Sequence, residues 1–205
     1  MNMRILITLL AALTFLGARA DETPNERQAR RIFDKSYQLV FGDEGASLHY
    51  DVNIVGIYKT KGDITIKGKK QKFTDERVNT WNDGVTAYMA YRKKGIVEIH
   101  HANSDKKDKY SGRFKFSLDD FTYNVSSDPD GLLLTLKQKK GAKGSIKEVR
   151  ALVDRGSYVP KRLRIKVAFF WTTINISNFH SGGISDNVFV FPKKRYEGWK
   201  FVDKR

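Results

Sequence analysis

Residues 48–54 read Leu-His-Tyr-Asp-Val-Asn-Ile, and this run carries the pattern that decides the fold. Its apolar side chains alternate with polar ones, which indicates a β-strand with one buried face. The same period of two predicts further strands at Ile64 and Ile66, Phe114 to Leu118, Leu163 to Val167, Ile174 and Ile176, and Val188 to Phe191.

Turn signals separate these runs at intervals of about ten residues, which predicts roughly ten or eleven antiparallel strands. Each turn signal consists of a glycine and the residue before it. They are Lys61-Gly62, Asp83-Gly84, Lys94-Gly95, Asp130-Gly131, Arg155-Gly156 and Gly182-Gly183, the last preceded by Ser181. A sheet of that size has to coil or close. Its apolar side chains then face either a second layer of the same sheet or an unfilled hollow, and periodicity alone leaves both open.

One helix is predicted, over residues 24–41. Thr23 is placed to cap it, Pro24 occupies its first turn and Glu26 completes a capping box. Apolar residues then recur at steps of three and four along one stripe, at Ala29, Ile32, Phe33, Tyr37 and Val40. Gly42 is expected to end the helix. A helix this short cannot cover the apolar face of the whole sheet.

The first twenty residues have the features of a secretory signal peptide. Arg4 precedes the apolar run Ile5 to Leu16, and Ala18-Arg19-Ala20 matches a small-x-small cleavage site. We therefore predict cleavage after Ala20 and a single soluble periplasmic domain over residues 21–205. The chain has no cysteine, so this domain must be held together by its own core.

The chain is strongly basic, with 38 lysines and arginines against 23 acidic residues and a net charge of +15. Such a charge suits nucleic acid, an anionic membrane surface or acidic ligands. Export argues against nucleic acid. The lysines are spread over turns rather than gathered on one helix, which favours solvated loops and protected sheet edges.

The sequence offers little for catalysis. His100 and His101 are neighbours on a predicted strand and must point to opposite faces, so they cannot share a metal ion. We interpret the four histidines as surface or strand-edge residues. Nucleophile elbows, phosphate loops and dinucleotide fingerprints are absent from the sequence. We predict a protein that is not an enzyme and has no cofactor or metal.

The order of these elements resembles the LolA family of periplasmic lipoprotein carriers. After the helix, residues 62–67 with Phe73 look like the opening of that family, and residues 81–88 with Tyr91 resemble its next strand pair. Residues 130–137 and 153–165 are similar to its later strands. The ending, with Phe189-Val190-Phe191-Pro192 and Val202-Asp203-Lys204-Arg205, resembles its closing motifs.

This resemblance implies a mainly β (α+β) fold: an incomplete antiparallel β-barrel whose N-terminal amphipathic helix plugs the concave face. It also implies a chaperone that binds the acyl chains of lipoproteins and carries them from an inner-membrane donor complex to an outer-membrane acceptor. We expect a monomer. The residues expected to line the lipid cavity are Ile32, Phe33, Tyr50, Val52, Ile54, Ile64, Ile66, Phe73, Met89, Tyr91, Leu134, Ile165, Ile174 and Phe189.

The chain departs from the family pattern in two places. Many carriers have an Arg-Pro pair whose arginine holds the lid, whereas here residues 67–72 are rich in lysine. We predict that Lys69, Lys70 and Lys72 lie at the cavity mouth and meet partners. The family's lid helix also has no counterpart in residues 104–117. A non-transporting module that binds or senses a lipid or envelope ligand on the same scaffold is therefore the alternative function.

Overall fold

The computed structural model describes residues 22–54, 58–104 and 117–205. The signal peptide predicted for residues 1–20 lies outside the described residues, as do Phe114 and Phe116 of one predicted strand. Within the described ranges, no helix is both long enough and apolar enough to span a membrane.

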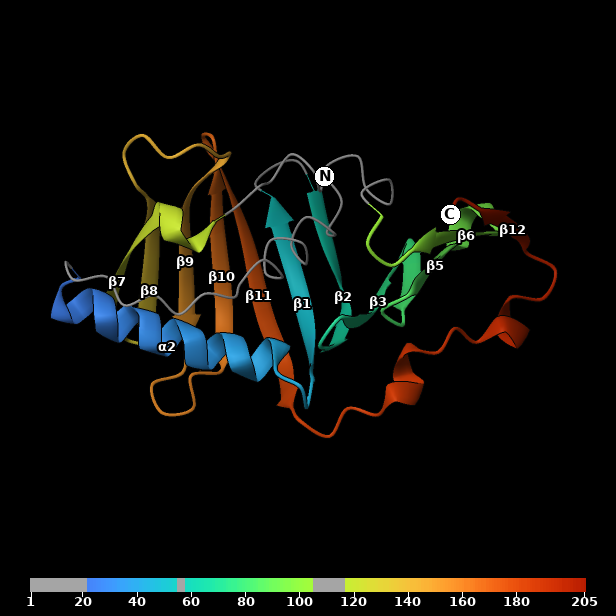
Figure 1. Cartoon of the computed structure of the whole chain (residues 1–205), viewed down its shortest axis with the longest axis horizontal. Coiled ribbons are helices and arrows are strands. Elements are labelled where there is room, and N and C mark those ends of the chain that lie inside the picture. Colours follow the sequence, from blue (N-terminus) through green and yellow to red (C-terminus); the bar gives the residue numbers. More distant parts are fainter. Residues whose placement is uncertain (1–21, 55–57, 105–116) are drawn as a thin grey trace. The chain divides into compact units, whose positions relative to one another are not determined.

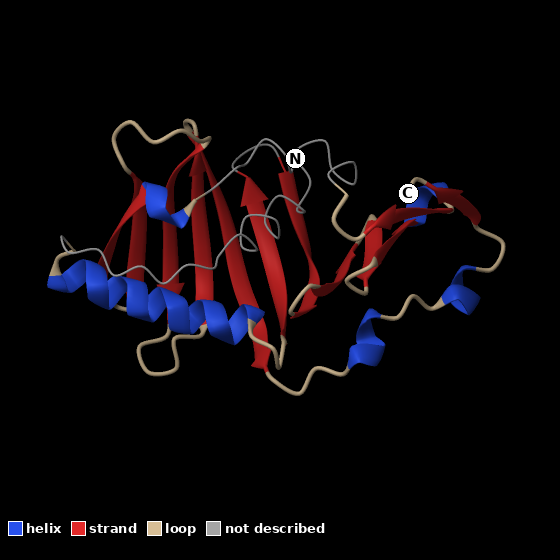
Figure 2. Cartoon of the chain, viewed as in Figure 1, coloured by secondary structure: helices blue, strands red, loops and turns tan. Residues whose placement is uncertain are grey.

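The described residues form one long helix, twelve strands and four short 3-10 helices (Figures 1 and 2). The helix is α2 (Pro24–Phe41), and the 3-10 helices are η1 (Arg92–Lys94), η4 (Leu118–Asp120), η5 (Asp186–Phe189) and η6 (Lys193–Tyr196). The strands are β1 (Ala46–Ile54), β2 (Tyr58–Lys67), β3 (Lys70–Asp75), β4 (Val78–Asn82), β5 (Thr86–Tyr91), β6 (Ile96–His101), β7 (Phe121–Asp128), β8 (Gly131–Gln138), β9 (Ile146–Val153), β10 (Pro160–Val167), β11 (Phe170–Ser181) and β12 (Lys200–Asp203).

The strands follow the order β12-β6-β5-β4-β3-β2-β1-β11-β10-β9-β8-β7. The end strands β12 and β7 are not neighbours, so the sheet does not close. This confirms the prediction of a mainly β fold that forms an incomplete barrel and has an N-terminal helix. The short β12 was not apparent from side-chain alternation, and it pairs with β6 in parallel rather than antiparallel fashion.

The chain divides into two compact units. Unit 1 comprises Met1–Ser36, Asn53–Tyr58 and Asp108–Asn175, and unit 2 comprises Tyr37–Val52, Lys59–Lys107 and Ile176–Arg205. Unit 1 therefore holds most of α2 with strands β7 to β10 and the first half of β11. Unit 2 holds most of β1 and β2, strands β3 to β6, and the C-terminal segment with β12.

The capping box at the start of α2 forms as predicted. The backbone N–H of Thr23 donates to Glu26 Oε2 at 2.9 Å, and the N–H of Glu26 donates to Thr23 Oγ1 at 3.2 Å. Ala29, Ile32 and Val40 on the apolar stripe are buried. The helix ends where the N–H of Gly42 donates to the carbonyl of Gln38 at 2.8 Å.

The strand predicted at Val188 to Phe191 is wrong. Residues 186–189 form the 3-10 helix η5, and Val190 and Phe191 lie outside any strand. Polar residues at its start favour a turn, because the N–H of Asn187 bonds to the Ser185 hydroxyl at 3.3 Å. Leu118, predicted in another strand, likewise lies in the short helix η4.

Candidate functional site

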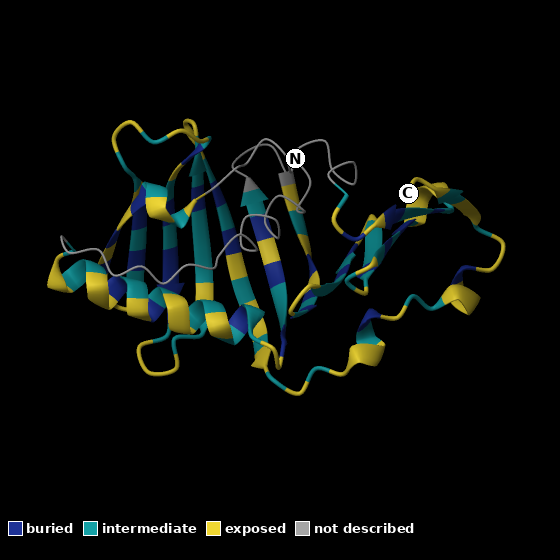
Figure 3. Ribbon diagram, viewed as in Figure 1, coloured by how far each residue is buried: buried dark blue, intermediate teal, exposed yellow. Residues whose placement is uncertain are grey.

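In unit 1, one face of the sheet carries two adjoining rows of apolar side chains. Strand register aligns Tyr123, Leu136, Val149 and Ile165 in one row, and Val125, Leu134, Ala151, Leu163 and Ile174 in the next. Residues paired across strands project to the same side, and the two rows lie two residues apart along each strand, so both rows share one face. All except Leu163 are buried. Figure 3 shows buried positions, in dark blue, recurring along the strands of unit 1.

Helix α2 packs on this face. Figure 1 shows it running across the strands of unit 1. The Asn25 side chain holds its start, because it donates to the Val125 carbonyl at 2.9 Å and accepts from the Val125 N–H at 3.0 Å. One turn later the Arg30 guanidinium lies 4.2 Å from the centre of the Tyr123 ring. Phe33 meets the same ring edge-on at 6.0 Å.

Five predicted cavity residues thus belong to unit 1. Ile32 and Phe33 come from the helix, and Leu134, Ile165 and Ile174 come from the sheet face on which it packs. The three strand residues are buried.

In unit 2, a second apolar face crosses strands β1, β2, β3 and β5. Register aligns Ile64, Phe73, Thr80 and Met89 across four strands, and Tyr50 stacks on Phe73 with ring centres 5.7 Å apart. Val52 and Ile66 follow Tyr50 and Ile64 by two residues and share their side. We call the set Tyr50, Val52, Ile64, Ile66, Phe73 and Met89 the apolar face of unit 2, and all six side chains are buried. The side chain of the predicted residue Ile54 lies outside the described residues.

Tyr50 carries an unusual polar atom into this apolar face. Its hydroxyl is buried and has no hydrogen-bond partner among the described residues. Burial raises the pKa of the phenol well above its ordinary value, and the nearby carboxylates of Asp75 and Asp63 add to that increase. The phenol therefore stays neutral and keeps its proton.

The same face becomes polar towards β6, where three side chains surround the Glu98 carboxylate. Glu98 accepts from the Tyr91 hydroxyl at 3.3 Å and from Lys204 Nζ at 2.5 Å, and its carboxylate lies 3.2 Å from His100 Nε2. Burial acts to raise the pKa of Glu98, but hydrogen bonds from Lys204 and His100 outweigh it and hold the pKa below the ordinary 4.5. We call these four residues the polar group.

His100 corrects the interpretation of the histidines as surface residues. Its side chain is only 2% exposed, whereas His101 on the opposite side of β6 is exposed. A glutamate two residues before a histidine on a strand was the available sequence signal, because such residues share a face. Across the described ranges, no three potential ligand side chains gather as a metal site would require.

An aromatic cluster occupies the other face of unit 2. Its members are Trp81, Tyr88, Phe191, Tyr196 and Trp199, packed with Ala90 and Val97. Phe191 stacks on Tyr88 at 4.4 Å and meets Trp81 edge-on at 5.4 Å. Trp81 pairs in register with Lys72, which alternates with Phe73, so the C-terminal segment lies on the side opposite the apolar face. The ligand contact of Phe189, which is buried at the end of η5, remains a prediction.

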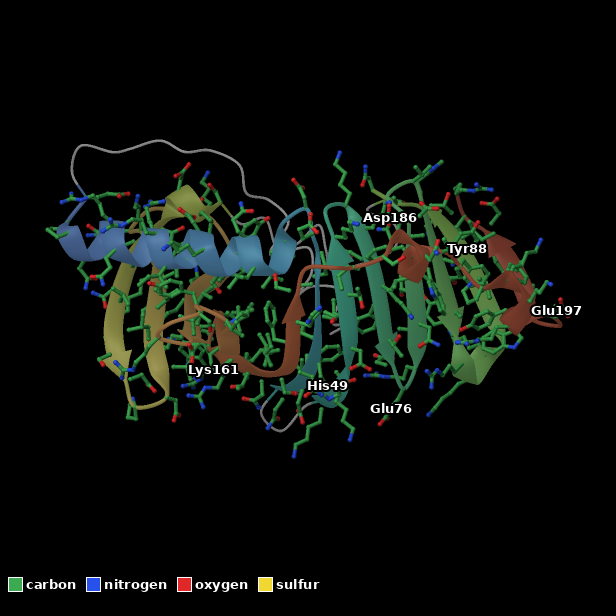
Figure 4. All side chains as sticks on the ribbon, turned by 90° about the horizontal axis from the view of Figure 1, so that it is seen from below. His49, Glu76, Tyr88, Lys161, Asp186 and Glu197 are labelled. Atoms are coloured by element: carbon green, nitrogen blue, oxygen red, sulfur yellow. The ribbon has the colours of Figure 1, made fainter. Side chains whose placement is uncertain are left out.

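The lysines predicted at the cavity mouth have distinct environments. Asp186, labelled in Figure 4, is the first residue of η5. Lys70 Nζ lies 2.9 Å from its carboxylate, and Lys67 Nζ lies 3.3 Å from it. These lysines lower the pKa of Asp186 through their hydrogen bonds. Lys69 is exposed in the turn, and Lys72 is half-buried beside Trp81. Lys70 thus ties the C-terminal segment to the β2–β3 hairpin, and a partner contact by the three lysines remains a prediction.

The polar group should make stability depend on pH. The folded pKa of Glu98 is depressed, so its stabilising effect is present above pH 4.5 and is lost as the pH falls through that lower pKa. We expect Glu98→Gln to be less stable than the wild type at pH 7, with a difference that shrinks below pH 4.5. Urea unfolding across a pH series measures it. A difference that stays constant down to acid pH would contradict the stated role of the carboxylate.

No protein-family model and no curated protein sequence matches this chain. Solved structures do resemble it in fold. A DUF1329 family protein from Desulfovibrio piger has a TM-score of 0.42 at 11% identity, over 83% of this chain and 99% of that one. A LolA superfamily protein from Nitrosomonas europaea has a TM-score of 0.40 at 8% identity, over 80% and 98%. A putative outer membrane lipoprotein-sorting protein domain from Vibrio parahaemolyticus has a TM-score of 0.42 at 9% identity, over 84% and 99%.

The predicted architecture is present in the chain itself. In the described residues, one capped helix precedes a single open sheet. Strands β2 to β6 and β7 to β11 pair antiparallel with their neighbours in sequence, and β12 pairs parallel with β6. The arrangement of the described residues therefore agrees with the predicted fold, an open and mainly antiparallel sheet preceded by one helix.

Proposed function

We propose that this protein binds the acyl chains of lipids or lipoproteins and carries them through the periplasm towards the outer membrane. One observation carries the proposal: the apolar face of unit 2 is a continuous set of large side chains on the side of the sheet opposite the aromatic cluster. A sheet that is apolar on both sides needs cover on both sides. The aromatic cluster covers one side, and an acyl chain is suited to replace the present cover of the other side.

The energetics suit a carrier. Burying an acyl chain of about fifteen methylenes, at about 0.8 kcal/mol each, is worth roughly 12 kcal/mol. The side chains of the apolar face are already shielded from water, so a ligand has to displace what covers them. That displacement lowers the net affinity, and it permits release to an acceptor.

Two features favour a lipid with a polar head over a plain hydrocarbon. The Tyr50 hydroxyl lacks a partner among the described residues, and the polar group around Glu98 lies on the same face as Met89. A chain lying along the apolar face would reach polar atoms at both positions. We propose that these atoms orient the ligand head.

In unit 1, α2 is proposed to act as the movable plug. Much of its attachment is polar: Asn25 bonds to Val125, and Arg30 lies between Glu22 and the Tyr123 ring. Polar contacts can be exchanged for contacts with water at little cost. The helix can therefore leave the apolar rows of unit 1 at a lower cost than an all-apolar contact would impose.

The alternative function is a module that binds or senses a lipid without transporting it. Both functions require ligand binding, and only transport requires release to an acceptor. Native mass spectrometry of protein taken from its periplasm would identify a bound lipid or lipoprotein. A transfer assay with donor and acceptor membranes would then separate the two functions.

A matched pair of threonines tests the site. Thr80 lies in register between Phe73 and Met89, whereas Thr65 projects from the opposite face of the same sheet beside Lys72. We expect Thr80→Glu to weaken binding of a fluorescent fatty acid by about tenfold to a hundredfold, because a carboxylate loses water there. Thr65→Glu should bind as the wild type does. A titration that finds no saturable site in the wild type would contradict the proposal. An equal loss of affinity in both variants would show that the site does not lie on the apolar face of unit 2.

A further inference from the structure

The tip of the β10–β11 hairpin exposes two adjacent phenylalanines. Val167 pairs with Phe170 across a two-residue turn, in which Ala168 has a φ of 52°. Phe169 is 90% exposed and Phe170 is 63% exposed. A non-glycine residue with positive φ is uncommon, so this turn is held in a conformation that costs energy while presenting apolar rings to water.

Basic residues surround this tip. The N–H of Ala168 donates to the Ser145 carbonyl at 3.2 Å, which joins the tip to the β8–β9 loop, residues 139–145. That loop contains three lysines and no acidic residue, and its Lys140 and Lys143 are exposed. The nearest strand positions continue the pattern, because Arg164 and Lys166 lie 4.7 Å and 5.9 Å from the ring centre of Trp171.

Acidic residues also lie near this end. Glu148 is paired, because it lies 2.6 Å from Arg150, which itself lies 5.0 Å from the centre of the Trp171 ring. Asp120 of η4 adjoins the loop, since its backbone carbonyl accepts the N–H of Lys139 at 2.7 Å. Residues 139–145 and 167–170 themselves contain no acidic residue, so the charges of the loop and tip are positive, around two exposed apolar rings.

We propose that the hairpin tip Phe169–Phe170 and the lysine loop 139–145 dock this protein on an anionic lipid surface. Apolar side chains enter the boundary between headgroups and acyl chains, while lysines remain at the charged surface. A bilayer fits better than a protein partner, because a two-residue tip offers much less area than a specific protein interface buries. This docking surface belongs to unit 1 and does not depend on the acyl-binding proposal.

Vesicle binding by the purified protein tests the apolar part. The N-terminus of the preparation is determined by mass spectrometry, because an uncleaved Ile5–Leu16 run would itself bind lipid. On vesicles of phosphatidylcholine with phosphatidylglycerol, the double variant Phe169→Ser, Phe170→Ser should bind roughly a hundredfold more weakly, at about tenfold for each partly inserted ring. Val85→Ser is the matched control, since Val85 is a 76% exposed apolar residue in the β4–β5 turn. It should bind as the wild type does.

The lysines supply the charge dependence. The double variant Lys140→Gln, Lys143→Gln should lose about fivefold for each lysine on the anionic vesicles. Salt should weaken wild-type binding, because exposed charges are screened. Vesicles of phosphatidylcholine alone should bind the wild type and this variant equally weakly.

A single label places the tip in the bilayer. The chain has no cysteine, so Phe169→Cys and Val85→Cys each carry one environment-sensitive fluorophore. Anionic vesicles should shift the emission of the label at residue 169 to the blue and leave that at residue 85 unchanged. Equal binding by wild type and the double phenylalanine variant, a label at residue 169 that stays in water, or self-association through the tip in gel filtration would each overturn the proposal. Acyl-probe binding should be normal in all tip variants, which separates this docking from the proposed function.

Discussion

Replacing Tyr123 with alanine is expected to lower the free energy of unfolding by about 3–5 kcal/mol, the range for buried aromatic residues. Tyr123 is buried in the row of unit 1 on which α2 packs. The variant would remove the ring that both Arg30 and Phe33 contact, so the helix would lose its central attachment. Chemical denaturation followed by circular dichroism measures the change.

Tyr123→Phe is the control for this prediction. It keeps the ring and removes only the hydroxyl, which donates to the Leu118 carbonyl at 3.3 Å. Its loss should be about 1 kcal/mol, the net value of one hydrogen bond. If the alanine variant lost no more than the phenylalanine variant, the ring would not anchor the helix. If Tyr123→Ala also increased acyl-probe binding, the helix would act as the proposed plug.

Gly62→Ala is expected to be the second most damaging change, with a loss of about 3 kcal/mol from overpacking. Gly62 faces Asp75 across the β2–β3 pair, where the backbone of β3 and the Tyr50 side chain both approach closely. A methyl group there would overlap the Thr74 carbonyl oxygen and crowd the Tyr50 hydroxyl. Either β3 or the Tyr50 ring has to move, and the apolar face of unit 2 would be distorted with it.

Gly156→Ala provides the comparison for Gly62. In the β9–β10 connection, the nearest atom to an added methyl at Gly156 is Asp154 Oδ1 at 3.8 Å, an ordinary contact. Its effect should stay within about 0.5 kcal/mol, as for most surface substitutions. Thermal unfolding of both variants tests the pair. Similar melting temperatures for the two would show that the space around Gly62 relaxes easily.

Local interactions explain what could be predicted from the sequence. The capping box joins residues only three apart, and α2 has the predicted bounds. The turn between β4 and β5 depends on Asp83, whose Oδ1 accepts from the N–H groups of Val85 and Thr86. Alternation placed β1, β10 and β11 because side-chain direction in a strand has a period of two.

Alternation does not say what covers each face of a strand. The six residues of the apolar face of unit 2 do share one side of the sheet. The segment around Phe191, which was predicted as a strand walling the same hollow, packs on the opposite face. Period-two spacing in a short run is also compatible with a turn, and Ser185 together with Pro192 decides for the turn. The burial of His100 was also missed, because alternation does not show which face of β6 is covered.

The sequence by itself determined the helix, most of the strands and the sides to which their residues point, because these depend on neighbours a few positions away. Only the tertiary structure decided which distant groups meet. Asn25 bonds to Val125 across 100 residues, and Lys204 reaches Glu98 across 106. The exposed tip at Phe169 also had to be seen in the structure, because alternation alone would let these rings be core. Contacts between distant residues depend on how all the strands pack at once, and no local pattern of residues specifies that packing.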